Sequence, residues 1–190
     1  MSAKFDYIVW NNFLEKEQAI DLNKFIENNF DFYEPKDWGA KTDNGEYKKD
    51  SKVKIIKWKK IKNLLNNLEQ QILYANQQNF GYDINFIFEE QNCFFNIYSS
   101  ENLSNYDWHT DRSSNQLTDI KLTMLLNLST ESYEGGEFQL NYSGEVKTIE
   151  NFKKCGDMIL FKSHILHKVL PTKKGIRKTL AIFFEGPNFR

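Results

Sequence analysis

The stretch GDMILFKSHILHKVLPTKKGIRKTLAIFFEG, residues 156–186, decides the fold class of this chain. It holds three short segments rich in Ile, Leu, Phe and Thr, separated by Ser, Pro and Gly. Segments of this kind, bounded by turn residues, are typical of β-strands. Similar segments recur at intervals of about ten residues after residue 82, which predicts about eight strands in a sandwich, barrel or jelly roll.

The first 82 residues have a different pattern. Residues 5–10 read as a short strand, and apolar residues at helical spacing predict helices over 14–30 and 61–75, the second stopped by Gly81. The polar, turn-rich segment 31–52 is expected to be a long loop or hairpin, either a lid that contacts substrate or a mobile surface loop. We therefore expect one domain over residues 1–190. Its helical support and loop occupy 1–82, and its β-rich core occupies 83–190.

Composition excludes several classes of protein. With 40% hydrophobic and 15% aromatic residues the 190-residue chain is expected to form one soluble globular domain. A net charge of -1 gives no argument for nucleic-acid binding, and the lysines of residues 48–62 are read as solvated rather than as an anion site. Cys93 and Cys155 form neither a CxxC motif nor a disulfide framework. No membrane span or leader is visible, so the expected location is the cytoplasm.

Arginine is rare in this chain. Among 25 Lys and Arg residues only Arg112, Arg177 and Arg190 are arginine, so an arginine is expected where lysine will not serve. The lysine-rich, asparagine-rich composition also suggests an AT-rich genome, such as that of a phage, in which case the location would be the host cytoplasm.

Candidate metal-binding side chains occur in the segment YDWHTD, residues 106–111. In an extended segment residues i and i+2 point to the same side, so His109 and Asp111 are expected to face one interior. The other histidines are His164 and His167, whose offset of three puts them on opposite faces of a strand. Two histidines and one carboxylate describe the facial triad of non-haem Fe(II) oxygenases.

Arg177 lies ten residues after His167, and Pro171 and Gly175 mark a turn between them. The spacing predicts that the two residues lie on adjacent antiparallel strands. A guanidinium facing inward there could hold a carboxylate in a bidentate pair, a geometry that lysine cannot match. The alternative is a surface salt bridge.

Taken together, these motifs resemble the Fe(II)/2-oxoglutarate-dependent dioxygenases, and most closely the prolyl 4-hydroxylase-like branch with its bacterial PKHD-type hydroxylases. The resemblance covers about residues 94–186. It rests on the order of His109-Thr110-Asp111, the turn YEGGE at 133–137, Gly156-Asp157, and LHKVLPTKKGIR at 166–177. Gly135-Gly136 needs only a tight turn with positive φ.

The resemblance implies a double-stranded β-helix, or jelly roll, buttressed by N-terminal helices. It implies Fe(II), 2-oxoglutarate and O2 as cofactor and cosubstrates, with ascorbate as a further expectation. The reaction would hydroxylate a C–H bond, with a prolyl residue of a peptide or protein as the leading substrate and a free amino acid, another small molecule or a nucleobase as the alternatives. Succinate and CO2 would be released.

The resemblance also assigns residues. His109, Asp111 and His167 would bind the metal, while His164 would be structural or would support the ligands without binding the metal. Arg177 would bind the far carboxylate of 2-oxoglutarate. Tyr98 stands near a tyrosine that helps to hold this carboxylate in related enzymes. Asn127 stands near a family tyrosine position, so its residue type departs from the pattern.

Two other readings stay open. The chain could be a jelly-roll binding module without turnover, or a cupin-like metal enzyme that does not use 2-oxoglutarate. The sequence does not indicate an oligomeric state.

Overall fold

Two antiparallel β-sheets pack face to face in the computed structural model, which describes residues 5–33, 49–111, 117–142 and 144–189. The large sheet has the strand order β1 (Tyr7–Trp10), β10 (Met158–Lys162), β6 (Thr118–Asn127), β13 (Ile176–Pro187), β4 (Asn92–Ser99) and β3 (Lys52–Lys57). The small sheet has the order β2 (Lys49–Asp50), β5 (Asn105–His109), β11 (Leu166–Val169), β8 (Phe138–Tyr142) and β9 (Glu145–Thr148). A ribbon of β12 (Thr172–Lys174) and β7 (Glu134–Gly135) lies beside them. The predicted jelly roll is confirmed.

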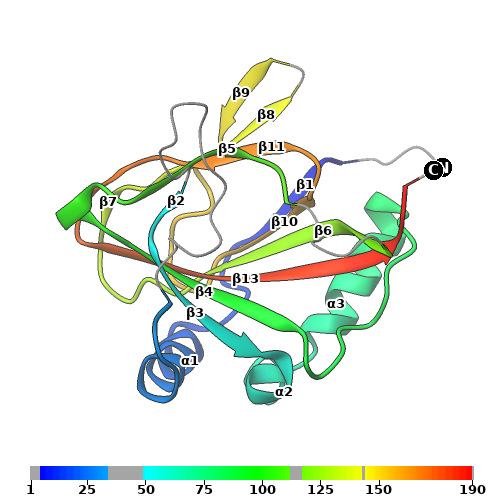
Figure 1. The fold of residues 1–190 in the computed structure, drawn as a ribbon, viewed down its shortest axis with the longest axis horizontal. Helices are drawn as coiled ribbons and strands as arrows, with labels where there is room; N and C mark the ends of the chain where they lie inside the picture. Colours follow the sequence, from blue (N-terminus) through cyan, green and yellow to red (C-terminus); the bar gives the residue numbers. More distant parts are fainter. Residues whose placement is uncertain (1–4, 34–48, 112–116, 143, 190) are drawn as a thin grey trace.

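The helices cover the outer face of the large sheet, opposite the small sheet (Figure 1). They are α1 (Lys16–Asn29), α2 (Trp58–Ile61), a 3-10 turn (Lys62–Leu64), α3 (Leu68–Ala75) and a π-helical turn (Asn76–Phe80); a further 3-10 turn (Ser100–Asn102) follows β4. α1 buries Ala19, Leu22 and Ile26, which recur at helical spacing. None of the described helices has the length and apolar character needed to cross a bilayer.

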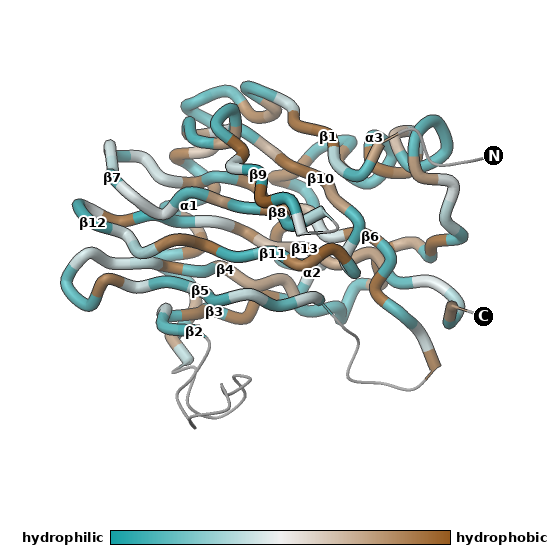
Figure 2. The backbone as a smooth tube through the Cα atoms, turned by 90° about the horizontal axis from the view of Figure 1, so that it is seen from above, coloured by the Kyte–Doolittle hydropathy of each residue, from teal (hydrophilic) through white to brown (hydrophobic). Residues whose placement is uncertain are grey.

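The large sheet carries a core on each face because side chains alternate along its strands. Figure 2 shows the hydropathy of each residue along this backbone, with hydrophobic residues in brown. On β6, Leu122, Met124 and Leu126 belong to the core that includes the helices. Thr123 and Leu125, between them, face the small sheet and line a cavity there. The same alternation along β13 buries Leu180 and Ile182 against the helices. One sheet therefore joins the helical core to the interior of the sandwich.

The N-terminal segment contributes more than helices. β1 pairs with β10, and β3 pairs with β4, so both edges of the large sheet come from residues before 82. The predicted strand over 5–10 is present as β1. The sequence pattern does not predict β3, because its lysines are typical of a solvated surface.

The prediction of one continuous helix over 61–75 is wrong. Asn67 has a left-handed backbone (φ 62°), which ends the first helical turns and starts α3 separately. Gly81 does stop the helical segment, with a φ of 72° at its C-terminal cap. Of the loop predicted over 31–52, residues 34–48 lie outside the described part of the chain, and Lys49–Asp50 forms β2.

The prediction that His167 and Arg177 lie on adjacent strands is also wrong. β11 belongs to the small sheet and β13 to the large one. The intervening β12 pairs with β7 and carries the chain from one sheet to the other. The turn therefore spans the sandwich, and the two side chains reach one cavity from opposite walls. The region after residue 82 contains the short β7 and β12 in addition to the longer strands, which explains why it exceeds the expected eight.

Gly156 fixes the approach of the N-terminal segment to β10. Its backbone is left-handed (φ 89°), its N–H donates to Asn127 O (2.8 Å), and its carbonyl accepts from Leu14 N (3.2 Å). A Cβ built on Gly156 would lie 2.1 Å from the Leu14 carbonyl oxygen, so no side chain fits without backbone movement.

We predict that Gly156→Ala lowers the free energy of unfolding by about 3 kcal/mol or more, because it combines strain with a backbone clash. The matched control is Gly81→Ala, where φ is also positive (72°) but no atom lies within 4 Å of the built Cβ. The control should cost only the strain, about 1–2 kcal/mol. Denaturant unfolding measures both; equal losses would contradict the role given to the Leu14 contact.

Candidate metal and carboxylate site

A cavity of about 140 Å³ lies between the two sheets. One wall comes from β4, β6 and β13 of the large sheet and the other from β2, β5, β8 and β11 of the small sheet. Its described lining combines apolar rings with a few charged groups, which is the composition of most ligand sites.

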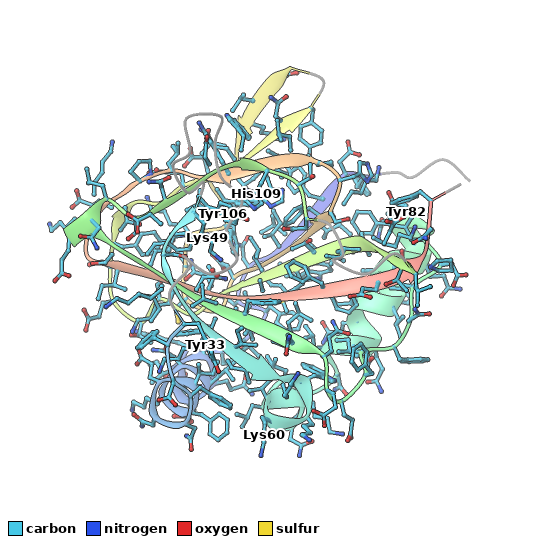
Figure 3. All side chains as sticks on the ribbon, in the orientation of Figure 1. Tyr33, Lys49, Lys60, Tyr82, Tyr106 and His109 are labelled. Carbon is cyan, nitrogen blue, oxygen red and sulfur yellow. The ribbon has the colours of Figure 1, made fainter. Side chains whose placement is uncertain are left out.

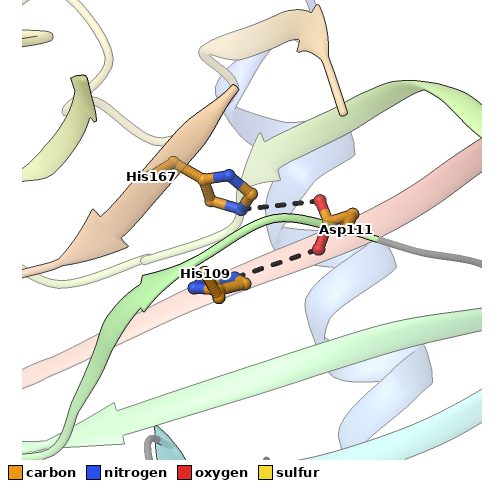
Figure 4. Close-up of side chains that lie close together, drawn as sticks. All are labelled: His109, Asp111 and His167. Atoms are coloured by element: carbon orange, nitrogen blue, oxygen red, sulfur yellow. Dashed lines mark ion pairs between the residues drawn. The ribbon is translucent and has the colours of Figure 1, made fainter. Parts of the chain in front are cut away.

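His109, Asp111 and His167 come together at this cavity, as the sequence predicted (Figure 4). Their ligand atoms all lie within 4.8 Å of one another. Asp111 Oδ1 lies 3.9 Å from His109 Nε2, and Asp111 Oδ2 lies 3.5 Å from His167 Nε2. The Cα atoms of His109 and His167 are partners in the pairing of β5 with β11. Strand pairing thus brings together residues that are far apart in sequence.

Both imidazoles are oriented by backbone carbonyls. His109 Nδ1 lies 2.7 Å from Asp107 O, and His167 Nδ1 lies 2.8 Å from Ile165 O. A neutral imidazole that donates from Nδ1 presents its Nε2 lone pair on the opposite side of the ring. In both histidines that nitrogen is the one near Asp111, so the geometry suits a metal ion bound through Nε2 and carboxylate oxygen.

Asp111 is held from two directions. Its Oδ2 accepts a hydrogen bond from the Thr123 hydroxyl (2.7 Å), and its backbone N–H donates to Ser163 O (3.0 Å). Ser163 in turn bonds the start of β6, through its N–H to Lys121 O (3.1 Å) and its hydroxyl to Ile120 O. The carboxylate is therefore fixed to β6 although it follows the end of β5.

A β-bulge explains why Tyr106 joins the site. In a regular strand Tyr106 and His109 would point to opposite faces, because they are three residues apart. β5 changes register against β11 between the pairs His167–His109 and Val169–Tyr106, which inserts an extra residue. The two rings therefore lie on one side and stack, with centroids 3.4 Å apart and planes inclined by 13°. Trp108 instead lies under the Lys168 ammonium, 4.6 Å from its ring centroid.

Arg177 is among the largest fully buried side chains, with 1% of its surface exposed. Its Nε and both terminal nitrogens have no hydrogen-bond partner in the described part of the protein. A buried, unpaired guanidinium is costly, so its presence at the wall of a cavity indicates that an anion belongs there. Its neighbours are aromatic: the Tyr98 ring centroid lies 5.3 Å and the Phe152 centroid 5.9 Å from Cζ.

Gly136 makes room for this arginine. A Cβ built on Gly136 would lie 2.8 Å from Arg177 Cδ. Gly135 and Gly136 both have positive φ (76° and 64°), as expected from the turn. The YEGGE motif therefore shapes the arginine's surroundings as well as the turn.

Tyr98 and Asn127 differ in their position relative to the cavity. Tyr98 is the strand partner of Arg177, lines the cavity and is 3% exposed; burial raises its pKa to about 12, so its hydroxyl stays protonated at neutral pH. Asn127 is not among the described residues that line the cavity. Its amide donates to Tyr133 Oη (3.1 Å) and Lys153 O (2.9 Å), and its Oδ1 accepts from Ser129 N (2.9 Å). It ties loops together, and its assignment to the cosubstrate remains a prediction.

His164 lies away from the cavity. It is exposed and contacts the ring of Phe189 edge-on, with centroids 6.0 Å apart. His167, by contrast, is 3% exposed.

Lys49 is a charged residue of the cavity that the sequence reasoning missed. Its Nζ donates to Asn96 Oδ1 (2.6 Å) and lies 5.1 Å from the Tyr106 ring centroid. Within the lysine-rich segment 48–62 nothing local distinguishes it. Only its place on β2, opposite Tyr106, carries it inward.

The comparisons agree with this geometry. A family model described as the 2OG-Fe(II) oxygenase superfamily matches residues 93–185, which include the triad and Arg177. Residues 93–185 of this chain are therefore similar to this superfamily.

The proteins that this chain resembles differ from it in length and sequence. A PKHD-type hydroxylase of Nitrosomonas europaea is 28% identical over 101 residues, which span 49% of this chain and 43% of that relative, less than half its length. A prolyl-4-hydroxylase of Pseudomonas putida has a TM-score of 0.68 at 17% identity, covering 96% of this chain and 94% of that one. A Trichoplax adhaerens prolyl hydroxylase, solved with a peptide of hypoxia inducible factor, has a TM-score of 0.67 at 18% identity, covering 94% and 83%. At these identities the structures share the fold.

The residues present fit the cofactors that the superfamily name implies. Two Nε2 atoms and a carboxylate suit Fe(II), and the unpaired Arg177 suits a carboxylate of 2-oxoglutarate. The second fit is independent of the first, because it rests on a polar group left without a partner.

We predict that Thr123→Val weakens Fe(II) binding about tenfold, because an unsupported Asp111 is less well oriented. Valine keeps the shape of threonine and removes only the hydroxyl. Thr118→Val is the matched control, since Thr118 lies on the same strand and donates to Glu185 (2.6 Å) instead. Anaerobic calorimetric titration measures both affinities, and an unchanged Thr123→Val affinity would exclude this supporting role.

We also predict that Arg177→Met raises the free energy of unfolding of the ligand-free protein by about 1 kcal/mol or more, because it removes a buried unpaired charge. Added 2-oxoglutarate with Fe(II) should stabilise the parent protein against denaturant much more than the variant. The control is Lys178→Met, which loses an ion pair with Glu27 (2.6 Å) and should not gain stability. A ligand-free loss of stability in Arg177→Met would show that the guanidinium is satisfied internally.

Proposed function

We propose that the protein is an Fe(II)- and 2-oxoglutarate-dependent hydroxylase that acts on a C–H bond of its substrate. The observation that carries this proposal is the buried, unpaired guanidinium of Arg177, which shares one cavity with the triad of His109, Asp111 and His167. A metal site alone would suit many enzymes. A metal site and an arginine without a hydrogen-bond partner in the same cavity suit a cosubstrate that chelates the metal at one end and carries a carboxylate at the other.

The positions of the residues in the cavity wall suggest which ligand each would bind. The triad would hold Fe(II) on one face, and Arg177 would bind the far carboxylate of 2-oxoglutarate through a bidentate pair. Tyr98, protonated and beside Arg177, is placed to donate a further hydrogen bond. Bound together, the metal, cosubstrate and dioxygen supply the oxidising power, and succinate and CO2 are the by-products.

The remaining lining excludes water. Phe94, Leu125, Phe138 and Phe183 line the same cavity, and the rings of Phe94 and Phe183 lie 5.5 Å apart. Apolar walls prevent hydrolytic and other side reactions and orient the substrate.

The leading substrate in this proposal is a prolyl residue of a peptide or protein. It is supported by the fold shared with prolyl hydroxylases, one of them solved with a peptide. The use of ascorbate and a cytoplasmic location stay predictions.

Substitution of the two histidines tests the role of the triad. Anaerobic Fe(II) and 2-oxoglutarate should give a weak visible charge-transfer band, which His109→Ala and His167→Ala should abolish. His164→Ala is the matched control, because His164 is exposed and lies outside the cavity; it should keep the band. Aerobic incubation should then yield succinate, and mass spectrometry of candidate peptides should find a gain of one oxygen.

The outcomes separate the alternatives. A binding module without turnover gives neither band nor succinate. A cupin-like metal enzyme binds Fe(II) without responding to 2-oxoglutarate. Loss of the band in His164→Ala with retention in His167→Ala would refute the ligand set.

A further inference from the structure

Tyr106 and His109 lie next to each other in the wall of the cavity (Figure 3). Their rings stack face to face, with centroids 3.4 Å apart and planes inclined by 13°. Because this separation is at the lower limit of van der Waals contact, the two rings overlap with almost no lateral offset. The phenol of Tyr106 therefore covers one face of an imidazole that belongs to the candidate metal site.

The two histidines of the site are supported in different ways. His167 lies on β11, between β5 and β8, and its ring centroid lies 5.7 Å from that of Phe138 and 4.8 Å from that of Phe161. His109 is the last residue of β5, and in the described structure β2 pairs only with the first two residues of this strand. The side chain of His109 is 10% exposed, against 4% for His167. Tyr106 thus gives His109 the ring contact that His167 receives from the core.

The stack adds a constraint that the hydrogen bond of His109 lacks. Nδ1 of this imidazole lies 2.7 Å from Asp107 O, and a single contact at one nitrogen leaves the ring free to tilt about the line that joins the two atoms. A second ring laid over the face of the imidazole opposes this tilt. The direction of Nε2, which lies 3.9 Å from Asp111 Oδ1, is therefore fixed by both contacts.

The geometry of the stack also suits an imidazole that carries positive charge. Two neutral aromatic rings prefer an offset or edge-on arrangement, because their negative faces repel each other when the rings are superposed. An imidazole that binds a cation through Nε2 loses electron density to it, and the negative face of a phenol then attracts the imidazole as it attracts other cations. The superposed rings of Tyr106 and His109 have the arrangement expected of a metal-bound ligand.

We propose that Tyr106 is a positioning residue of the metal site, whose ring stabilises the metal-bound form of His109 through the negative charge of its face. This inference rests on the proposed function, because it requires a metal ion at the triad. Tyr106 then determines metal affinity without binding the metal. The role belongs to the ring and does not need the phenolic hydroxyl.

The test compares rings of similar shape and different charge. Fe(II) alone is titrated anaerobically into the complete protein and followed by calorimetry. Tyr106→Phe keeps a ring with a negative face, so its affinity should stay within about threefold of that of the parent protein. Pentafluorophenylalanine introduced at residue 106 has nearly the same shape but a positive face, so the affinity should fall about tenfold. Tyr106→Leu removes the ring and should lose at least as much.

Trp108→Leu is the matched control. Trp108 lies on the same strand, but its ring lies under the Lys168 ammonium, with 4.6 Å between Nζ and the ring centroid. Removal of this ring should leave the Fe(II) affinity unchanged. Denaturant unfolding of the metal-free proteins shows which variants are folded, and the fluorinated protein still decides if Tyr106→Leu does not fold.

A second readout shows which ligand is affected. Co(II) bound at the triad shifts the proton NMR signals of its ligands, including the Nδ1–H protons of the two histidines. Both nitrogens lie close to backbone carbonyls, which should slow exchange of these protons with solvent. In the fluorinated protein the signal of His109 should move while that of His167 stays. Phe138→Leu, which changes a ring beside His167, is the reciprocal variant and assigns the two signals.

The possible results distinguish this proposal from the proposed function. Equal Fe(II) affinity with phenylalanine and pentafluorophenylalanine at residue 106 would overturn the proposal, because the shape of the ring would then be sufficient. Equal movement of both histidine signals would also overturn it, since the change would then act on the whole cavity. If the parent protein binds neither Fe(II) nor Co(II), the metal site is rejected and the proposed function with it.

Discussion

The antiparallel pairing of β11 with β5 is the constraint on which the site depends. It makes His167 and His109 direct partners, so the two imidazoles meet wherever the sheet forms. The bulge in the same pair turns Tyr106 onto the face of His109, and the hydrogen bond from Asp111 N to Ser163 O places the third ligand. The candidate metal site is therefore a consequence of strand register, and a slip of one residue would point the triad away from the cavity.

The charged groups around the triad are paired in different ways. Asp111 is supported by Thr123, and both histidines by backbone carbonyls, so these groups are oriented before any ligand arrives. Arg177 is left without a partner in the described structure. Side chains that are oriented in advance favour metal binding, and a buried guanidinium without a hydrogen-bond partner would be stabilised by an anion.

Much of this arrangement could be predicted from the sequence. The i, i+2 rule placed His109 and Asp111 on one face, and the scarcity of arginine singled out Arg177. The strand spacing left His164 and His167 open, and only the resemblance chose between them. The fold class followed from segment length and turn residues, which are local properties.

The missed features depend on long-range pairing. Lys49 reaches Asn96 across 47 residues of sequence, a contact that no local pattern indicates. β3 was hidden because Lys52 and Lys57 are exposed while Val53 and Ile56 are buried, a pattern read as a solvated run of lysines. Asn67 broke the predicted helix through a backbone conformation that its residue type permits but does not require.

Because the large sheet packs on both faces, we expect its cavity residues to tolerate substitution less well than the edge strands of the small sheet. Residues of β6 and β13 that line the cavity alternate with residues that hold the helices, so altering the cavity floor disturbs the packing behind it. β2 and β9, at the edges of the small sheet, carry no such layer among the described helices. Under the proposed function, substitutions on the small sheet could therefore change substrate preference at little cost in stability, whereas substitutions in the cavity wall of the large sheet would also disturb the helical core.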